Sequence, residues 1–206
     1  MKRSILISLK TLTWLGCLTP LALLIYRAVN NTLGPDPTAE IASITGLTAL
    51  WLLAGTLAIS PIRVISPRLN WLIRFRRLLG LFVFFYATLH MLTWLALYAG
   101  FDLNTLKTDI TKRRFIIMGV TTYLLLLPLA ATSTNWAIRK MGGKNWNRLH
   151  KLIYLAAVTA TIHYWWKVKT GVLSPAPFTL VLLILLGARP LIAWAQKKRK
   201  ARAVPV

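Results

Sequence analysis

Residues 78–99 read LLGLFVFFYATLHMLTWLALYA and contain no charged side chain. As an α-helix this stretch is about 33 Å long, which is enough to span the roughly 30 Å of hydrocarbon in a bilayer. Apolar runs of similar length occupy residues 9–29, 41–62, 115–132, 149–166 and 177–194. We therefore predict an all-α integral membrane protein, a bundle of six transmembrane helices.

The six runs use most of the 206 residues, so the sequence predicts one membrane domain over residues 1–206 and no folded soluble domain. Any nucleotide-binding or soluble redox module must then belong to another protein. No internal repeat is evident. We interpret residues 9–29 as a retained helix rather than a cleaved signal peptide, because Lys10 interrupts its start and no small-residue cleavage site follows. The single cysteine, Cys17, excludes an internal disulfide, a Cys-ligated zinc site and an iron–sulfur cluster.

The charge balance is strongly basic, with 26 Lys and Arg against 4 Asp and Glu. These residues lie between the apolar runs and at their ends, which is typical of topology signals and anionic-lipid contacts rather than of nucleic-acid binding. With both termini inside, 19 of the 26 basic residues fall on the inner side. The outer seven are Arg27, Lys107, Lys112, Arg113, Arg114, Lys167 and Lys169. The positive-inside rule therefore predicts that both termini are cytoplasmic.

The chain has only three histidines, and all of them lie in two of the six runs. An ionisable side chain inside a bilayer is a functional candidate by default. His90 follows Arg77 by 13 residues, and His163 follows His150 by the same number, so His90 and His163 are each expected about 20 Å from the inner side. Two imidazoles at one depth on facing helices can supply both axial ligands of a haem iron. We predict that His90 and His163 hold b-type haem.

His150 is expected near the inner surface, level with Arg77 rather than with another histidine. A second haem with a ligand other than histidine, or a flavin, remains open at that end. Each histidine could instead be satisfied by a backbone carbonyl. Zinc needs three or four converging ligands, and a proton relay needs carboxylates within the helices, so both are less favoured. A metal or proton transporter and a membrane anchor for a partner stay as rival functions.

Several segments resemble one known family. They are RRLLGL at residues 76–81 with ATLH at 87–90, NWNRLHKLIYL at 145–155 with TIHY at 161–164, TSTN at 132–135 and LGPDP at 33–37. They resemble the ferric-reductase-like transmembrane family, and in particular the haem-binding membrane subunits of bacterial periplasmic systems that repair oxidised methionine in proteins. The resemblance covers nearly the whole chain.

The resemblance implies haem b at the outer site, an associated FMN, and a multi-pass protein of the bacterial inner membrane. It implies an electron-transfer subunit that receives electrons from a cytoplasmic reduced flavin or flavin reductase. Sulfoxide reduction would then occur on a periplasmic molybdenum-containing partner, MsrP. Relatives usually carry two histidines on each of two helices, whereas Arg77 stands about where one inner histidine would be. Arg77, Arg148 and Lys151 are candidate partners of a flavin phosphate or a haem propionate, with ordinary inner-surface charge as the alternative.

Overall fold

The computed structural model describes residues 3–168 and 174–202, and every regular element in them is helical. The α-helices are α1 (Arg3–Val29), α2 (Pro37–Ile65), α3 (Arg76–Leu92), α4 (Leu103–Lys112), α5 (Arg114–Ala131), α6 (Asn135–Met141), α7 (Gly143–Leu149), α8 (Leu152–Lys167) and α9 (Ala176–Arg202). A 3₁₀ segment η1 (Pro67–Phe75) precedes α3, and a π-helical segment η2 (Thr93–Tyr98) extends it. The predicted all-α class is confirmed.

Four segments are long and apolar enough to cross a membrane: Arg3–Val29, Pro37–Ile65, Pro67–Tyr98 and Arg114–Ala131. Helix α8 has only 16 residues. The apolar part of α9, Ala176–Ile192, is also shorter than those four. The chain is thus an all-helical membrane protein with four spans recognised by length and composition.

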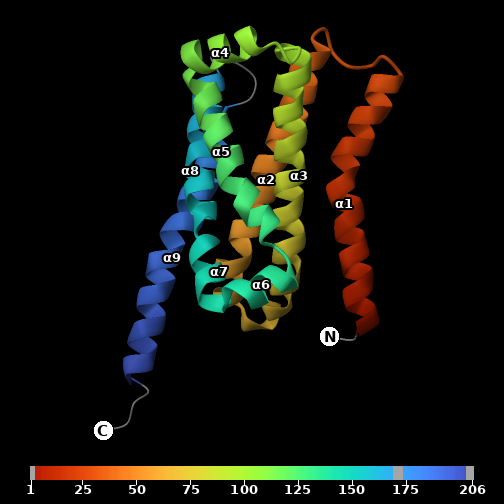
Figure 1. Ribbon diagram of the computed structural model, residues 1–206. Coiled ribbons are helices and arrows are strands. Elements are labelled where there is room, and N and C mark those ends of the chain that lie inside the picture. Colours follow the sequence, from red (N-terminus) through yellow and green to blue (C-terminus); the bar gives the residue numbers. More distant parts are fainter. Residues whose placement is uncertain (1–2, 169–173, 203–206) are drawn as a thin grey trace.

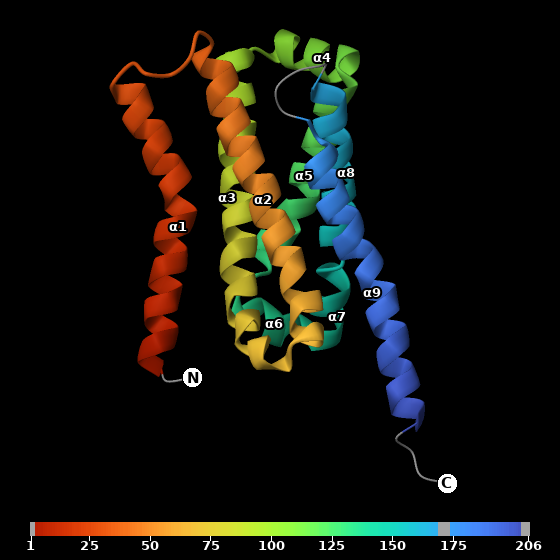
Figure 2. The ribbon, with the colours of Figure 1, turned by 180° about the vertical axis from the view of Figure 1, so that it is seen from behind.

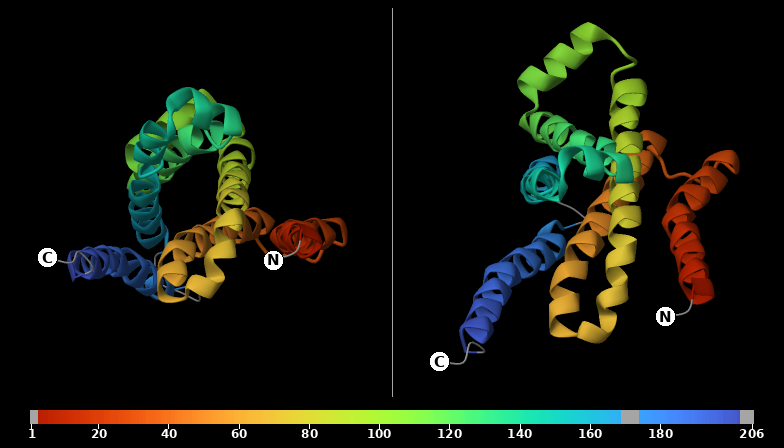
Figure 3. Two further views of the ribbon diagram at one scale, coloured as in Figure 1. Left: turned by 90° about the horizontal axis from the view of Figure 1, so that it is seen from below. Right: turned by 60° about the horizontal axis from the view of Figure 1, so that its bottom comes forward.

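Helices α2, α3, α5 and α8 form the central bundle, with the closest packing between α2 and α3 and between α5 and α8 (Figure 1). Seen along the bundle, these four helices stand around a common axis, with α1 and α9 outside them on opposite sides (Figure 3). Helix α4 lies across one end, which we call the outer end, and α6 and α7 close the other, the inner end (Figure 1). The two chain ends both lie towards the inner end (Figure 2).

The core of the bundle contains large aliphatic side chains of α2 and α5 and small side chains of α8. Leu53 and Leu57 of α2 pack with Leu126 of α5 and with Ala156 and Ala157 of α8. Both alanines are 0% exposed. Such small residues let neighbouring membrane helices approach closely, and this explains the tight pairing of α8 with α5.

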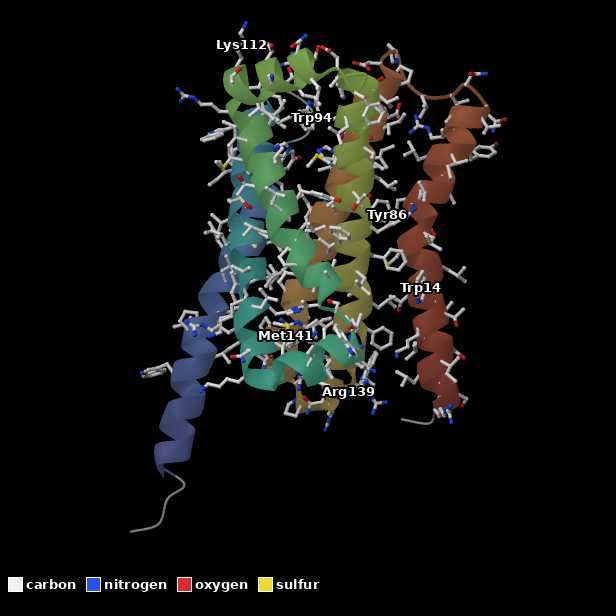
Figure 4. All side chains as sticks on the ribbon, in the orientation of Figure 1. Trp14, Tyr86, Trp94, Lys112, Arg139 and Met141 are labelled. Carbon is white, nitrogen blue, oxygen red and sulfur yellow. The ribbon has the colours of Figure 1, made fainter. Side chains whose placement is uncertain are left out.

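Tyr86 attaches the outlying α1 to the bundle. Its side chain points from α3 towards α1 (Figure 4) and is 0% exposed. The hydroxyl donates to the Cys17 carbonyl at 2.6 Å and accepts from the Leu21 amide at 3.2 Å. Both backbone groups flank Pro20, which lies inside α1. A single buried phenol therefore satisfies polar backbone beside a proline, where the regular helical hydrogen-bond pattern is interrupted.

The structure corrects several predicted boundaries. The fifth apolar run was expected to include His150, but α8 begins at Leu152 and His150 caps the end of α7 instead. Gly142, with φ of 75°, ends α6 and lets the polar residues that follow form a separate short helix. The segment 100–114 contains helix α4, whose N-terminus is capped by Asp102. These helices were missed because their sequences are polar or short.

Candidate functional site

His90 of α3 and His163 of α8 face each other across the bundle. Their ring centroids are 5.9 Å apart and the ring planes are inclined at 86°. A metal-bound imidazole nitrogen lies about 2 Å from the metal and the ring centre roughly 1 Å further, so two imidazoles on opposite sides of one ion have centres about 6 Å apart. The observed spacing fits one metal ion held between the two rings. The depth count from the sequence had predicted that these two residues lie level.

Both rings are oriented by backbone carbonyls of the neighbouring helix. Nδ1 of His90 is 2.9 Å from the carbonyl oxygen of Ala42 in α2, and Nδ1 of His163 is 2.6 Å from that of Phe115 in α5. A carbonyl oxygen only accepts hydrogen bonds, so each Nδ1 carries the hydrogen and each Nε2 keeps its lone pair. This is the usual arrangement around metal-ligating histidines. Both side chains are therefore prepared to bind a metal through Nε2.

Two glycines make room for the two rings. A Cβ atom at Gly46 of α2 would lie 3.1 Å from both Cε1 and Nδ1 of His90. A Cβ atom at Gly119 of α5 would lie 2.8 Å from Nδ1 and 2.9 Å from Cε1 of His163. Each glycine follows the acceptor carbonyl by one helical turn. A glycine in an apolar membrane helix often marks such a close approach.

These matched contacts indicate an internal repeat, which was not evident from the sequence alone. In both halves the histidine lies 48 residues from its carbonyl acceptor. The acceptor, glycine and histidine of the second half each follow their counterparts by 73 residues, and ATLH at 87–90 corresponds to ATIH at 160–163. Helices α2 and α5 run in one direction and α3 and α8 in the other. The two helix pairs thus form a parallel repeat around an axis along the bundle.

A cavity of about 880 Å³ surrounds the two histidines and is lined by residues of α2, α3, α5 and α8. Its inner wall carries no charged side chain and is mostly apolar, with Leu53, Val83 and Leu126 beside the phenol of Tyr123. Its outer part reaches Trp94 and the start of α5. Ligand pockets usually enclose about 300–1,000 Å³ and are mostly apolar. The volume, the lining and the two prepared nitrogens fit a flat, largely apolar group with a central metal ion.

The remaining predicted site residues lie at the inner end, away from this pair. His150 stacks on Trp146 with ring centroids 3.8 Å apart, and its Nε2 is 3.1 Å from Oγ1 of Thr132. Arg77 donates from Nη1 to Oδ1 of Asn135 at 2.8 Å. Arg148 and Lys151 are exposed. Within the described part of the chain, no three His, Cys, Asp or Glu residues cluster closely enough to hold a metal ion.

The fold and this pair of histidines define a class: membrane bundles that bring two imidazoles together from separate helices. A family model described as "Ferric reductase like transmembrane component" matches residues 41–161, from the start of α2 into α8. This match includes His90 and His150 and ends just before His163.

Curated relatives narrow the class further. A protein of Ralstonia nicotianae is 40% identical over 192 residues, covering 92% of this chain and 88% of the relative. One from Herminiimonas arsenicoxydans is 41% identical, covering 95% and 90%, and one from Xanthomonas axonopodis pv. citri is 43% identical, covering 95% and 89%. All three are named protein-methionine-sulfoxide reductase heme-binding subunit MsrQ. The chain belongs to this MsrQ group of the ferric-reductase-like transmembrane family.

Proposed function

We propose that this chain is the electron-transfer subunit of a bacterial protein-methionine-sulfoxide reductase system. It would carry electrons across the inner membrane from a cytoplasmic reduced flavin or flavin reductase to the periplasmic molybdenum-containing MsrP. Sulfoxide reduction itself would take place on that partner. The names of the relatives support haem binding and the methionine-sulfoxide reductase system. MsrP and the flavin donor rest on the resemblance alone.

The observation that carries the proposal is the pair of facing imidazoles, in each of which the carbonyl contact at Nδ1 leaves the Nε2 lone pair for a metal. His90 and His163 would be the two axial ligands of one haem b. When bound there, haem supplies one-electron redox chemistry. The carbonyls of Ala42 and Phe115 hold the two Nδ1–H groups, fix the ring orientations and make each Nε2 a better donor. The apolar inner wall excludes water, which tunes the potential of a bound metal centre.

We propose six spans within one domain of residues 1–206, with both termini cytoplasmic. Helix α8 has 16 residues and rises only about 24 Å, but it packs along the whole bundle beside α5. Helix α9 extends past the inner end of the bundle and ends in basic residues. The positive-inside rule and the shared end of the two termini support this topology.

The inner end would be the electron entry side. We propose that His150 serves an inner haem or a flavin site, with FMN as a further cofactor. Arg77, Arg148 and Lys151 are the candidate partners of the flavin phosphate, since guanidinium and ammonium groups bind phosphate strongly. Their position at the cytoplasmic end of the predicted topology, next to a soluble donor, supports this assignment.

An absorption spectrum of the purified full-length protein tests the central claim. Low-spin haem with two imidazole ligands gives a Soret band and, on reduction, sharp α and β bands. A metal or proton transporter, or a membrane anchor, gives no such bands. A colourless preparation from haem-replete cells would refute haem binding and with it the electron-transfer function.

A further inference from the structure

Four cationic residues line the outer mouth of the histidine cavity: Lys112, Arg113, Arg114 and Lys167. Among the described lining residues, no Lys or Arg belongs to the inner part of the cavity. The cavity is therefore polarised, with an apolar inner wall and a basic outer mouth. A ligand with an apolar body and an anionic edge would be oriented by this difference.

One of these four cations is already neutralised. Oδ1 of Asp109 is 3.2 Å from Nε of Arg113, and Oδ2 accepts a hydrogen bond from Nε1 of Trp94 at 3.0 Å. Asp109 is only 6% exposed. These contacts join α4 to η2 and hold α4 across the outer end, where Trp94 lies beneath it (Figure 4). The two carboxylate oxygens of Asp109 therefore already contact Arg113 and Trp94.

The other cations have no carboxylate partner in the described residues, whose only ion pairs are Arg27–Glu40 and Arg113–Asp109. Arg114 opens α5, where the helix dipole disfavours a positive side chain. Lys167 follows His163 by one helical turn and lines the same cavity. Arg114 directly precedes Phe115, whose carbonyl holds His163. Two unpaired cations therefore lie beside the candidate axial ligands.

We propose that Arg114 and Lys167 bind the two propionate carboxylates of the haem, whose polar edge faces the outer end. This inference rests on the proposed haem binding. Two carboxylates directed inward would meet Leu53, Val83 and Leu126 and no cationic side chain, so their charge would remain uncompensated within the membrane. Directed outward, they meet cations near the membrane surface and form charge-assisted hydrogen bonds. The edge of the haem then faces the side on which electrons leave.

The proposal is tested by the midpoint potential of the haem in full-length protein reconstituted in nanodiscs. Arg114→Gln and Lys167→Gln each remove a positive charge near the iron, which favours the ferric form. The expected result is a retained low-spin spectrum with a lower midpoint potential in each variant, and a lower one still in the double variant. Lys107→Gln is the matched control, because Lys107 is exposed on α4 and does not line the cavity. Its potential should equal that of the unaltered protein.

If Arg114→Gln or Lys167→Gln loses haem altogether, variants that keep the positive charge still test the proposal. Arg114→Lys and Lys167→Arg should restore both haem content and potential if charge is the cause. If they behave like the glutamine variants, or if the glutamine variants bind haem at an unchanged potential, the propionate assignment is wrong. Absence of haem from the unaltered protein would instead refute the proposed function, so the two failures are distinguishable.

Discussion

The outer and inner ends of the two helix pairs differ in how well the repeat is preserved. At the outer end, both halves present a histidine, a carbonyl acceptor and a glycine in the same geometry. At the inner end, the same 73-residue offset pairs Arg77 with His150. Arg77 bonds to Asn135 and His150 to Thr132, so the two positions have different partners. A ligand bound by both histidines would require the two halves to stay alike at the outer end, and the inner end, with Arg77 opposite His150, lacks such a matched pair.

The largest expected effect comes from the outer histidines. His90→Ala or His163→Ala removes one of two axial ligands and should abolish the low-spin haem spectrum. His150→Ala should leave most of it, because His150 does not line the cavity around the outer pair. Reduced-minus-oxidised difference spectra of the three variants provide the measurement. Equal losses in all three would mean that the outer and inner ends are not functionally separate.

Alanine substitutions at Gly46 and Gly119 test whether the His90 and His163 rings depend equally on the space beside them. Gly119→Ala places a Cβ atom 2.8 Å from His163, whereas Gly46→Ala places one 3.1 Å from His90. Gly119→Ala should therefore lower haem content strongly and Gly46→Ala less, as measured by the haem-to-protein ratio. Gly55→Ala in α2 is the control, because nothing lies within 4 Å of its added Cβ. If all three retain haem equally, the glycines do not shape the site.

Arg77→His would make the inner end as symmetric as the outer end. Both positions related by the repeat would then carry an imidazole, a potential pair of axial ligands. We expect the haem-to-protein ratio to rise above that of the unaltered protein. Arg77→Gln, which removes the charge without supplying a ligand, is the control. An unchanged ratio in Arg77→His would show that the inner ends of α3 and α8 are not placed to share one iron.

The sequence predicted the helical class from its long apolar runs. Residue counts along the helices placed His90 and His163 at one depth, and the structure brings their rings together. It did not predict the contacts that orient the rings, since Ala42 and Phe115 act through their backbone carbonyls and leave no side-chain signature. The contacts of Gly46 and Gly119 with the histidine rings could not be predicted for a related reason: each glycine acts through the absence of a side chain. The repeat has a sequence trace in ATLH and ATIH, but only the matched contacts of the two histidines identify it.

The smallest effect is expected for Thr132→Val, a nearly isosteric change at the inner end. It removes the hydroxyl beside Nε2 of His150, and with it the bond from the same hydroxyl to the Pro128 carbonyl. Because two hydrogen bonds are lost, the expected decrease in stability is about 1–2 kcal/mol. Thermal unfolding in detergent should show a slightly lower midpoint temperature, with the outer haem spectrum and potential unchanged.

Thr122→Val is the matched comparison. It breaks the hydrogen bond between the Thr122 and Thr159 hydroxyls, which joins α5 to α8 near the outer histidine pair. If Thr132→Val alters the outer haem more than Thr122→Val does, the two ends are coupled through α5, and the inner histidine cannot be treated as separate from the outer pair.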